Sequence, residues 1–522
     1  MGRVTVTGAM NTALTFINLV NALTPPAPPE LPYVPPPDPM DGMATLAELA
    51  RYRLTKSGFY LGDVHDDHGL SFPAGIDDDR HIFIKAGTRA GKGISLCIPN
   101  ALLWRGPLFM IDPKGEGASI AAMRRATREA AQGTGTNVRH FVGQQVAVLD
   151  PLGEVRGPAR ALRVAYNPLA DIDLRQGGGV RAINAAAAAL VTPEEGNGAH
   201  FAETAETIIA GLIEAVKVTE PPERQTLTQC RAIMLAGFDT LRAYLSKVET
   251  RAGLALEAAA LMDEVGGDEW GSHRSTLSRN MKWLAEPAMQ EHLVGSAFSL
   301  RRAVQEGWSV FVSLPPDDIP YFKGWLRLIV QTVIDAKMSL GVGQAGLQTL
   351  CLLDEFPTLG RFRAIEDSAG YMAGYGLKLV PIIQNIGQVK AHYAKNWETF
   401  LGNAGAIVGF GLNDDESEQY MATRLGRKFV TEATRSLSTG SGGQAIGGSA
   451  NFSENWSTAR HERPIRFPNE IREQGARETM RAFVVPASGR GFTIRRRTYM
   501  DFDPATYDSP AHIADWERRF WR

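Results

Sequence analysis

The chain has 522 residues, of which 44% are hydrophobic and 21% charged, and these values exclude a disordered chain, a collagen-like fibre and a multi-span transporter. Lys and Arg number 55 and Asp and Glu number 57, giving a net charge of -2. This balance excludes a uniformly basic nucleic-acid-binding protein, so any contact with nucleic acid requires locally clustered cations.

The N-terminal 44 residues differ in composition from the rest. Residues 4–29 carry no charged side chain, but the apolar part, 12–23, is shorter than the ~20 residues that a spanning helix needs and contains two asparagines. We therefore expect no transmembrane helix here, while a helix that binds a membrane surface or a partner remains open. Nine prolines within positions 25–39 predict a stiff spacer, so the folded body begins near residue 45.

Short apolar runs alternate with helical stretches along the body. The runs are nearly continuous in apolar residues, as expected for strands buried on both faces, and the alternation predicts βαβ units and an α/β fold with a mainly parallel sheet. The expected strands are 81–87, 107–112, 145–150, 308–314, 349–355, 377–384 and 406–412.

The alternation stops between about residues 180 and 299, where the sequence is Ala-rich and helical in period. An apolar stripe in this stretch consists of Ala205, Ile208, Ile209, Leu212, Ile213 and Val216. We expect residues 1–44 to form the uncharged segment and spacer, 45–179 the first part of a nucleotide-binding domain, 180–299 an inserted all-alpha domain, and 300–522 the second part of the nucleotide-binding domain with a C-terminal extension. A Gly/Ser-rich stretch, 437–450, predicts a mobile loop or surface linker. The three widely spaced cysteines argue against disulfides and favour a reducing compartment.

The strongest local motif follows the first expected parallel strand and precedes a helical run. It has the context of a phosphate-binding loop, in which small residues let backbone N–H groups approach phosphates and a lysine reaches the β- and γ-phosphates. Two positions depart from the common pattern, because Ala86 replaces the first glycine and Gly93 replaces the Ser or Thr that contacts Mg²⁺. Thr88, Ser95 or water must then serve the metal. The motif comprises Ala86, Gly87, Thr88, Arg89, Ala90, Gly91, Lys92 and Gly93.

Two adjacent carboxylates, Asp354 and Glu355, close a later apolar strand. In phosphate-loop ATPases the first such residue orients Mg²⁺ and its water, and the second polarises the attacking water as a general base. Together the two motifs, in this order, predict an ATPase that uses ATP and Mg²⁺. Gln384 ends the next expected strand, where it either senses the γ-phosphate or caps the strand.

Further charged residues lie near these motifs. The segment 111–116 ends another strand with Asp112, Lys114 and Glu116, at the edge where open α/β sheets bind ligands. Arg361 and Arg363 follow the paired carboxylates, and either could serve as an arginine finger in a ring ATPase, although a solvated charge is the commoner role. The basic residues at 124–128 and the run 495–497 are interpreted as solvated faces.

Several segments, in order, resemble the TraG-type conjugative coupling proteins, the ATPases of type IV secretion systems. They are TRAGKG, IPNALLW, DPKGE, YNPL, LLDEFPTLGRF, GYGLKLVPIIQN, NAGAIVGFGLND and RPIRFPNEI, and they span about residues 55–505. The resemblance implies a RecA-like nucleotide-binding domain with an inserted all-alpha domain, assembled as a homo-hexameric ring. It also implies that ATP hydrolysis delivers a relaxase-bound single strand of DNA, or effector proteins, to the channel subunits of the secretion system.

By motif, the resemblance implies that Lys92 binds phosphate, Asp354 holds Mg²⁺ through water, Glu355 activates water and Gln384 senses the γ-phosphate. Family members usually begin with a transmembrane hairpin, whereas this chain has only the weak apolar segment 4–23 and a proline spacer. The expected location is therefore the cytoplasmic face of the bacterial inner membrane, with peripheral or weak attachment. Two alternatives stay open. One is a nucleotide-binding receptor or adaptor with little ATPase activity, and the other is an FtsK-like DNA-translocating ring ATPase.

Overall fold

The computed structural model describes residues 42–65, 71–134, 141–175, 177–194, 196, 198–295, 297–343, 348–368, 370–440 and 451–502. The described chain divides into two units, a hairpin over 427–463 and a body that holds the remaining described residues apart from Gly42. The expected N-terminal spacer and the apolar stretch before it lie outside the described residues. Among the helices of the described ranges, none has the length and apolar character needed to cross a bilayer.

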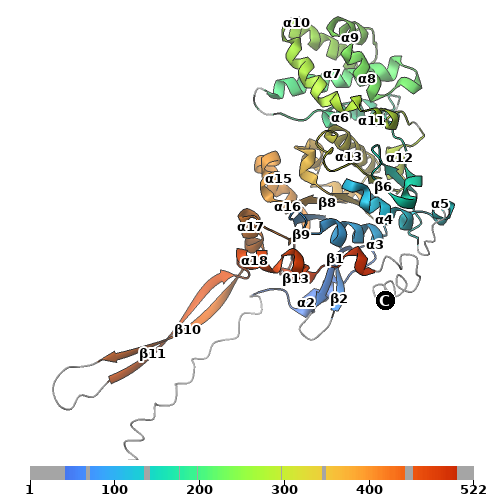
Figure 1. Ribbon diagram of the computed structural model, residues 1–522. Helices are drawn as coiled ribbons and strands as arrows, with labels where there is room; N and C mark the ends of the chain where they lie inside the picture. The colour runs from blue at the N-terminus through green and yellow to red at the C-terminus, as the bar shows by residue number, and fades with distance from the viewer. Residues whose placement is uncertain are drawn as a thin grey trace, which may run out of the picture. The chain divides into compact units, whose positions relative to one another are not determined.

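An eleven-stranded sheet forms the centre of the body, with the order β2-β1-β13-β12-β9-β3-β8-β7-β4-β6-β5 (Figure 1). Its strands are β1 (Phe59–His65), β2 (Ser71–Ile76), β3 (His81–Ala86), β4 (Leu108–Ile111), β5 (Val146–Leu149), β6 (Ser309–Val312), β7 (Thr349–Leu353), β8 (Leu377–Ile383), β9 (Ala404–Phe410), β12 (Arg481–Pro486) and β13 (Phe492–Arg495).

The seven strands from β9 to β5 are parallel, and each coincides with one of the apolar runs in the sequence. Every residue of these strands is buried, which explains their nearly continuous apolar composition. The register pairs Ile84 with Ile382 and Leu353 with Pro381, so β3, β8 and β7 end side by side. The segments that follow these three strands therefore meet at one edge of the sheet, and the expected α/β fold with a mainly parallel sheet is confirmed.

Four antiparallel strands at the other side of the sheet were not expected. β1, β2, β12 and β13 pair antiparallel, and β12 joins them to the parallel block by pairing antiparallel with β9. Their sequences contain Gly, Pro, Asp and Arg, so they lack the continuous apolar run of the central strands. These strands bring the C-terminal residues 492–502 next to the start of the body.

Helices cover the sheet and extend beyond it. The helices of the body are α2 (Leu46–Leu49), α3 (Ile98–Leu103), α4 (Glu116–Arg125), α5 (Arg128–Gly133), α6 (Gly179–Leu190), α7 (Gly198–Thr219), α8 (Leu227–Leu235), α9 (Phe238–Leu245), α10 (Leu254–Met281), α11 (Pro287–His292), α12 (Leu300–Gln305), α13 (Lys323–Met338), α14 (Arg363–Ser368), α15 (Ile386–Tyr393), α16 (Trp397–Gly402), α17 (Asp415–Leu425) and α18 (Pro468–Gln474).

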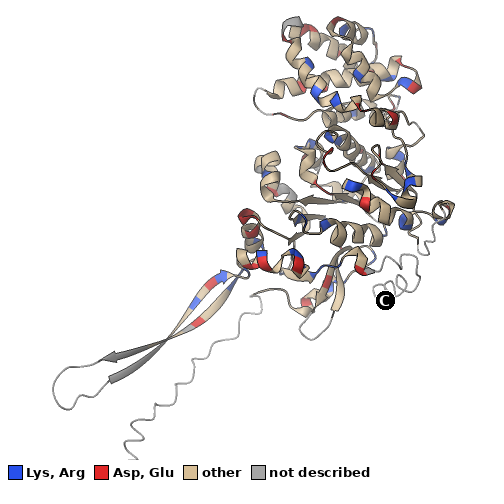
Figure 2. Ribbon diagram, in the orientation of Figure 1, with Lys and Arg blue, Asp and Glu red and all other residues tan. Residues whose placement is uncertain are grey.

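Helices α6 to α11 lie between β5 and β6 in the chain and form a helical layer, seen at the top of Figure 1. The apolar stripe expected from the sequence is buried along α7, which packs against α6 and α10. Helix α13 contacts α6, and residues of both belong to the core that continues into the sheet. Acidic and basic residues are interspersed over the described elements (Figure 2), in keeping with the small net charge.

The hairpin consists of β10 (Arg427–Gly440) and β11 (Asn451–Pro464), which form a separate two-stranded sheet. The expected loop over 437–450 is therefore wrong for residues 437–440, which belong to β10, while 441–450 lie outside the described residues. Composition misled here because Gly and Ser are common in turns and loops, although Thr itself favours strands. Within the hairpin, Arg427 pairs with Glu462 and the guanidinium of Arg460 lies over the ring of Phe429.

Candidate nucleotide site

The loop after β3 has a backbone shape that depends on close packing. A Cβ atom on Gly87 would lie 2.0 Å from the carbonyl oxygen of Gly411, so only glycine fits there. Arg89 has a φ of 58° and Gly91 a φ of 88°, both in the left-handed region. The loop leads directly into the helical turn η2 (Gly93–Cys97). A strained, Gly-containing loop between a buried strand and a helix has the backbone form that cradles phosphate.

The side chain of Lys92 lies between the two carboxylates that follow β7. Its Nζ atom is 3.0 Å from Oδ1 of Asp354 and also bonds Oε1 of Glu355. Burial lowers the pKa of Lys92, but the two carboxylates outweigh burial, and the net effect raises this pKa. The ammonium group therefore stays charged, as a phosphate-binding lysine must.

The paired carboxylates have different surroundings. Burial raises the pKa of Asp354 above its ordinary value, although Lys92 opposes the shift. Glu355 has a φ of 60°, an uncommon conformation for a residue with a side chain, and its N–H donates to Oδ1 of Asp354 at 3.1 Å. Such backbone strain in a charged residue is typical of functional sites.

Gln384 connects Glu355 to the phosphate-binding loop. Its amide nitrogen donates to both carboxylate oxygens of Glu355, at 3.0 and 2.8 Å, and its Oε1 accepts from the hydroxyl of Thr88 at 2.8 Å. The structure thus brings the loop, the two carboxylates and Gln384 into one hydrogen-bonded network, as the adjacent ends of β3, β8 and β7 require.

The side chains present fit ATP with Mg²⁺. The loop and Lys92 offer donors to phosphate, and carboxylate oxygens are the protein ligands that Mg²⁺ prefers when phosphates and waters complete its shell. No group of three or more acidic, His or Cys side chains able to hold a metal occurs in the described part of the chain. Thr88 and Ser95 were the candidates to replace the missing Ser or Thr at Gly93, and both hydroxyls already donate to protein oxygens. Donation uses the hydroxyl hydrogen and leaves lone pairs on the oxygen, so Thr88, Ser95 and water all stay candidates for that coordination position.

Asp112 ends β4 and is bound to the start of the following helix. Its carboxylate accepts hydrogen bonds from the N–H groups of Gly117 at 2.9 Å and Ala118 at 2.7 Å. Burial raises the pKa of Asp112 to about 7. These bonds give Asp112 a role in anchoring α4, whereas Lys114 and Glu116 of the same motif are exposed.

The two arginine-finger candidates lie apart from this network and pair with acids of their own chain. Nε of Arg361 is 3.1 Å from Oε2 of Glu366, and Nη1 of Arg363 is 3.8 Å from Oε1 of Glu206 on α7. Arg363 has the looser pairing and the more exposed side chain. Of the two, Arg363 is the freer to reach another molecule.

Three arginines interpreted as solvated from the sequence are buried. Arg124 and Arg125 are 7% and 0% exposed, and Arg125 donates to carbonyl oxygens of Ala101 and Trp104, each at 2.8 Å. Arg496 is 1% exposed and donates to the carbonyl of Ala90 in the phosphate-binding loop. Sequence reasoning missed Arg496, although the alternation of buried Phe492, Ile494 and Arg496 with more exposed Thr493 and Arg495 is the signal that could have identified it.

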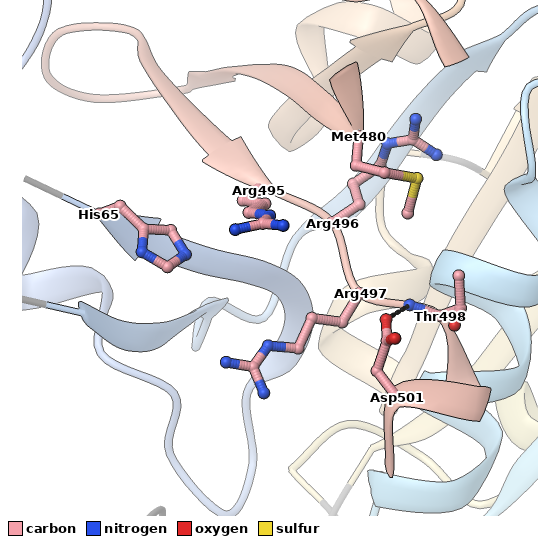
Figure 3. Close-up of a pocket in the computed structure, with 7 residues that line it drawn as sticks. All are labelled: His65, Met480, Arg495, Arg496, Arg497, Thr498 and Asp501. Carbon is pink, nitrogen blue, oxygen red and sulfur yellow. Dashed lines mark hydrogen bonds between the residues drawn. The ribbon is translucent and has the colours of Figure 1, made fainter. Parts of the chain in front are cut away.

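A cavity of about 410 Å³ lies beside the segment that follows β13 (Figure 3). This segment contains the turn η12 (Tyr499–Phe502), which packs against η2 directly after the phosphate-binding loop. Arg497 of the segment pairs with the buried carboxylate of Asp63. The residues lining the cavity are His65, Met480, Arg495, Arg496, Arg497, Thr498 and Asp501.

Comparison with known proteins gives consistent matches. The family described as type IV secretory system conjugative DNA transfer matches residues 46–485. The conjugal transfer protein TraG of Escherichia coli is 24% identical over 401 residues, covering 72% of this chain and 60% of that protein. Protein VirD4 of Rhizobium rhizogenes is 27% identical over 362 residues, covering 66% of this chain and 49% of that protein. The chain thus spans about half to two thirds of the length of these relatives.

Among solved structures, the plasmid coupling protein TrwB in complex with the ATP analogue ADPNP superposes with a TM-score of 0.60 at 17% identity, covering 89% of this chain and 96% of that one. TrwB in complex with ADP and Mg²⁺ gives a TM-score of 0.58 at 16% identity, covering 88% and 94%. These likenesses confirm the RecA-like fold that the resemblance implied.

Proposed function

The chain belongs to the type IV secretory system conjugative DNA transfer family, and from this we propose that it is a coupling ATPase that uses ATP hydrolysis to move single-stranded DNA with its relaxase, or effector proteins, toward a secretion channel. TraG, one of the relatives it matches, is named as a conjugal transfer protein, and the TrwB structures it resembles contain an ATP analogue or ADP with Mg²⁺.

The observation that carries this proposal is the network joining Thr88, Gln384, Glu355, Lys92 and Asp354. Its members come from three strand ends that the parallel sheet places side by side. A cation able to bind phosphate, a carboxylate able to accept a proton and an amide able to report on phosphate are the side chains that hydrolysis of a nucleoside triphosphate needs.

In the proposed mechanism each residue has one role. Lys92 exchanges its carboxylate partners for the β- and γ-phosphates. Glu355, released from Lys92, accepts a proton from the attacking water while the water oxygen bonds the γ-phosphorus and the bond from that phosphorus to the β–γ bridging oxygen breaks, so that ADP leaves. Gln384, whose amide nitrogen donates to Glu355, senses the γ-phosphate. Asp354 would hold Mg²⁺ through water, and the metal supplies neutralisation of phosphate charge when it is bound.

The proposed active form is a homo-hexameric ring at the cytoplasmic face of the bacterial inner membrane, in contact with channel subunits. In such a ring Arg363 would act as the arginine finger toward a neighbouring copy, because its contact with Glu206 is long and its side chain is about half exposed. Arg361 is the second candidate.

Assembly tests this proposal against the alternative of a receptor with little ATPase activity. With a non-hydrolysable ATP analogue and single-stranded DNA, native mass spectrometry is expected to show hexamers that retain DNA. The Arg363→Ala variant should assemble but hydrolyse ATP more slowly, because a finger contributes to catalysis across the interface. A protein that stays monomeric with both ligands present would contradict the ring motor and favour the receptor.

A further inference from the structure

Arg496 is a buried cation without an acidic partner among the described residues. Its side chain is 1% exposed, burial alone lowers its pKa to about 10, and its Nε and Nη2 atoms have no hydrogen-bond partner in the described part of the chain. The guanidinium lies 3.9 Å from the centre of the Phe410 ring, which ends β9. A buried charge without a counter-ion is costly, so its retention calls for a compensating interaction.

The hydrogen bonds that the Arg496 side chain makes go to the phosphate-binding loop and to the turn η2 that follows it. Nη1 donates to the carbonyl of Ala90 at 3.0 Å and to Oγ of Ser95 at 2.9 Å. The hydroxyl of Ser95 in turn donates to the carbonyl of Gly91 at 2.8 Å. The guanidinium of Arg496 therefore bonds the carbonyl of Ala90 directly and is linked to the carbonyl of Gly91 through the hydroxyl of Ser95.

Because the peptide bond is planar, fixing the direction of these carbonyls also fixes the direction of the N–H groups that follow them. The described chain has no cis peptide bond, so each C=O is antiparallel to the N–H of the next residue. Fixing the carbonyl of Ala90 toward Arg496 points the N–H of Gly91 the opposite way, and fixing that of Gly91 does the same for the N–H of Lys92. Both N–H groups then face away from Arg496, on the side where a loop of this kind binds phosphate.

We propose that Arg496 is a positioning residue for the phosphates of a nucleoside triphosphate. It fixes the loop carbonyls on the side opposite the phosphates, and the bound phosphates compensate the positive charge of Arg496. This inference rests on the proposed nucleotide-binding function and adds to it a residue about 400 positions away from the loop in the sequence. The neighbouring arginines do not share the role. Figure 3 shows the guanidinium of Arg496 pointing away from those of Arg495 and Arg497.

Substitution at position 496 tests the proposal with ATP and inorganic tripolyphosphate as probes, each with Mg²⁺, in isothermal titration calorimetry. Arg496→Met, of similar length but uncharged, is expected to lower the affinity for both probes about tenfold to a hundredfold. This is the range for loss of charge-assisted hydrogen bonds. Arg496→Lys, which keeps a cation and donors, should recover most of the affinity. Arg495→Ala removes an exposed arginine next in the chain and should leave both affinities within about twofold, since exposed charges contribute little.

The melting temperature of the nucleotide-free variants separates this role from simple packing. Loss of the bonds and loss of the uncompensated buried charge offset each other, so Arg496→Met should melt close to the unchanged protein. The proposal is overturned if the Arg496→Met and Arg496→Lys variants bind the probes with equal affinity. It is also overturned if the affinity for ATP falls while the affinity for tripolyphosphate does not. Should Arg496→Met fail to fold, Ser95→Ala replaces it and must weaken both probes by severalfold. An unchanged protein that binds neither probe would instead refute the proposed function itself.

Discussion

Replacement of Lys92 with Ala is expected to weaken ATP binding by at least about a hundredfold, as measured by calorimetry with Mg²⁺. Two effects combine in this variant. The phosphates lose their charged donor, and Asp354 and Glu355 lose the cation that lies between them. The carboxylates would then repel phosphate at short range.

A matched control for this variant is Lys282→Ala, because Lys282 is an exposed lysine of the helical layer. Its ATP affinity should equal that of the unchanged protein. If Lys92→Ala bound ATP within about threefold of the unchanged protein, Lys92 would be only a partner for the two carboxylates, and the loop would have another function.

Replacement of Glu355 with Gln is expected to lower ATP turnover about 10²–10⁴-fold, the contribution of a positioned general base. ATP binding should persist, because Lys92 and the loop remain and one negative charge near the phosphates is removed. Steady-state phosphate release measures the first quantity and calorimetry the second.

Glu306→Gln serves as the control for this change, since Glu306 pairs with Arg302 on the surface of α12. Binding and turnover that fell together in Glu355→Gln would show that Glu355 supports the loop rather than the chemistry. In that case the strained backbone at position 355 and the contacts to Gln384 would be structural features.

Much of the parallel half of the sheet could be predicted because strands buried on both faces carry continuous apolar runs. β4 and β7 are examples, and each is followed directly by a carboxylate, Asp112 or Asp354. The antiparallel strands could not be predicted in the same way. β1 contains Gly62 and Asp63, whose burial depends on pairing with β13, a strand more than 400 residues later in the sequence.

The residues of the site likewise fall into those placed by the parallel strands and those placed by the antiparallel strands. Lys92, Asp354, Glu355 and Gln384 could be predicted to meet, because each follows a parallel strand and the sheet aligns those strand ends. Arg496 was missed because its run of three arginines looks like a solvated patch, and only the alternation that starts in β13 places the middle residue on the buried face.

The measurement that tests the account most directly is ATP hydrolysis by the purified protein, with and without single-stranded DNA, under identical Mg²⁺ and salt. The account predicts measurable turnover that rises when DNA is added. ATP binding without turnover, in the presence or absence of DNA, would contradict the motor and identify the chain as a nucleotide-dependent receptor.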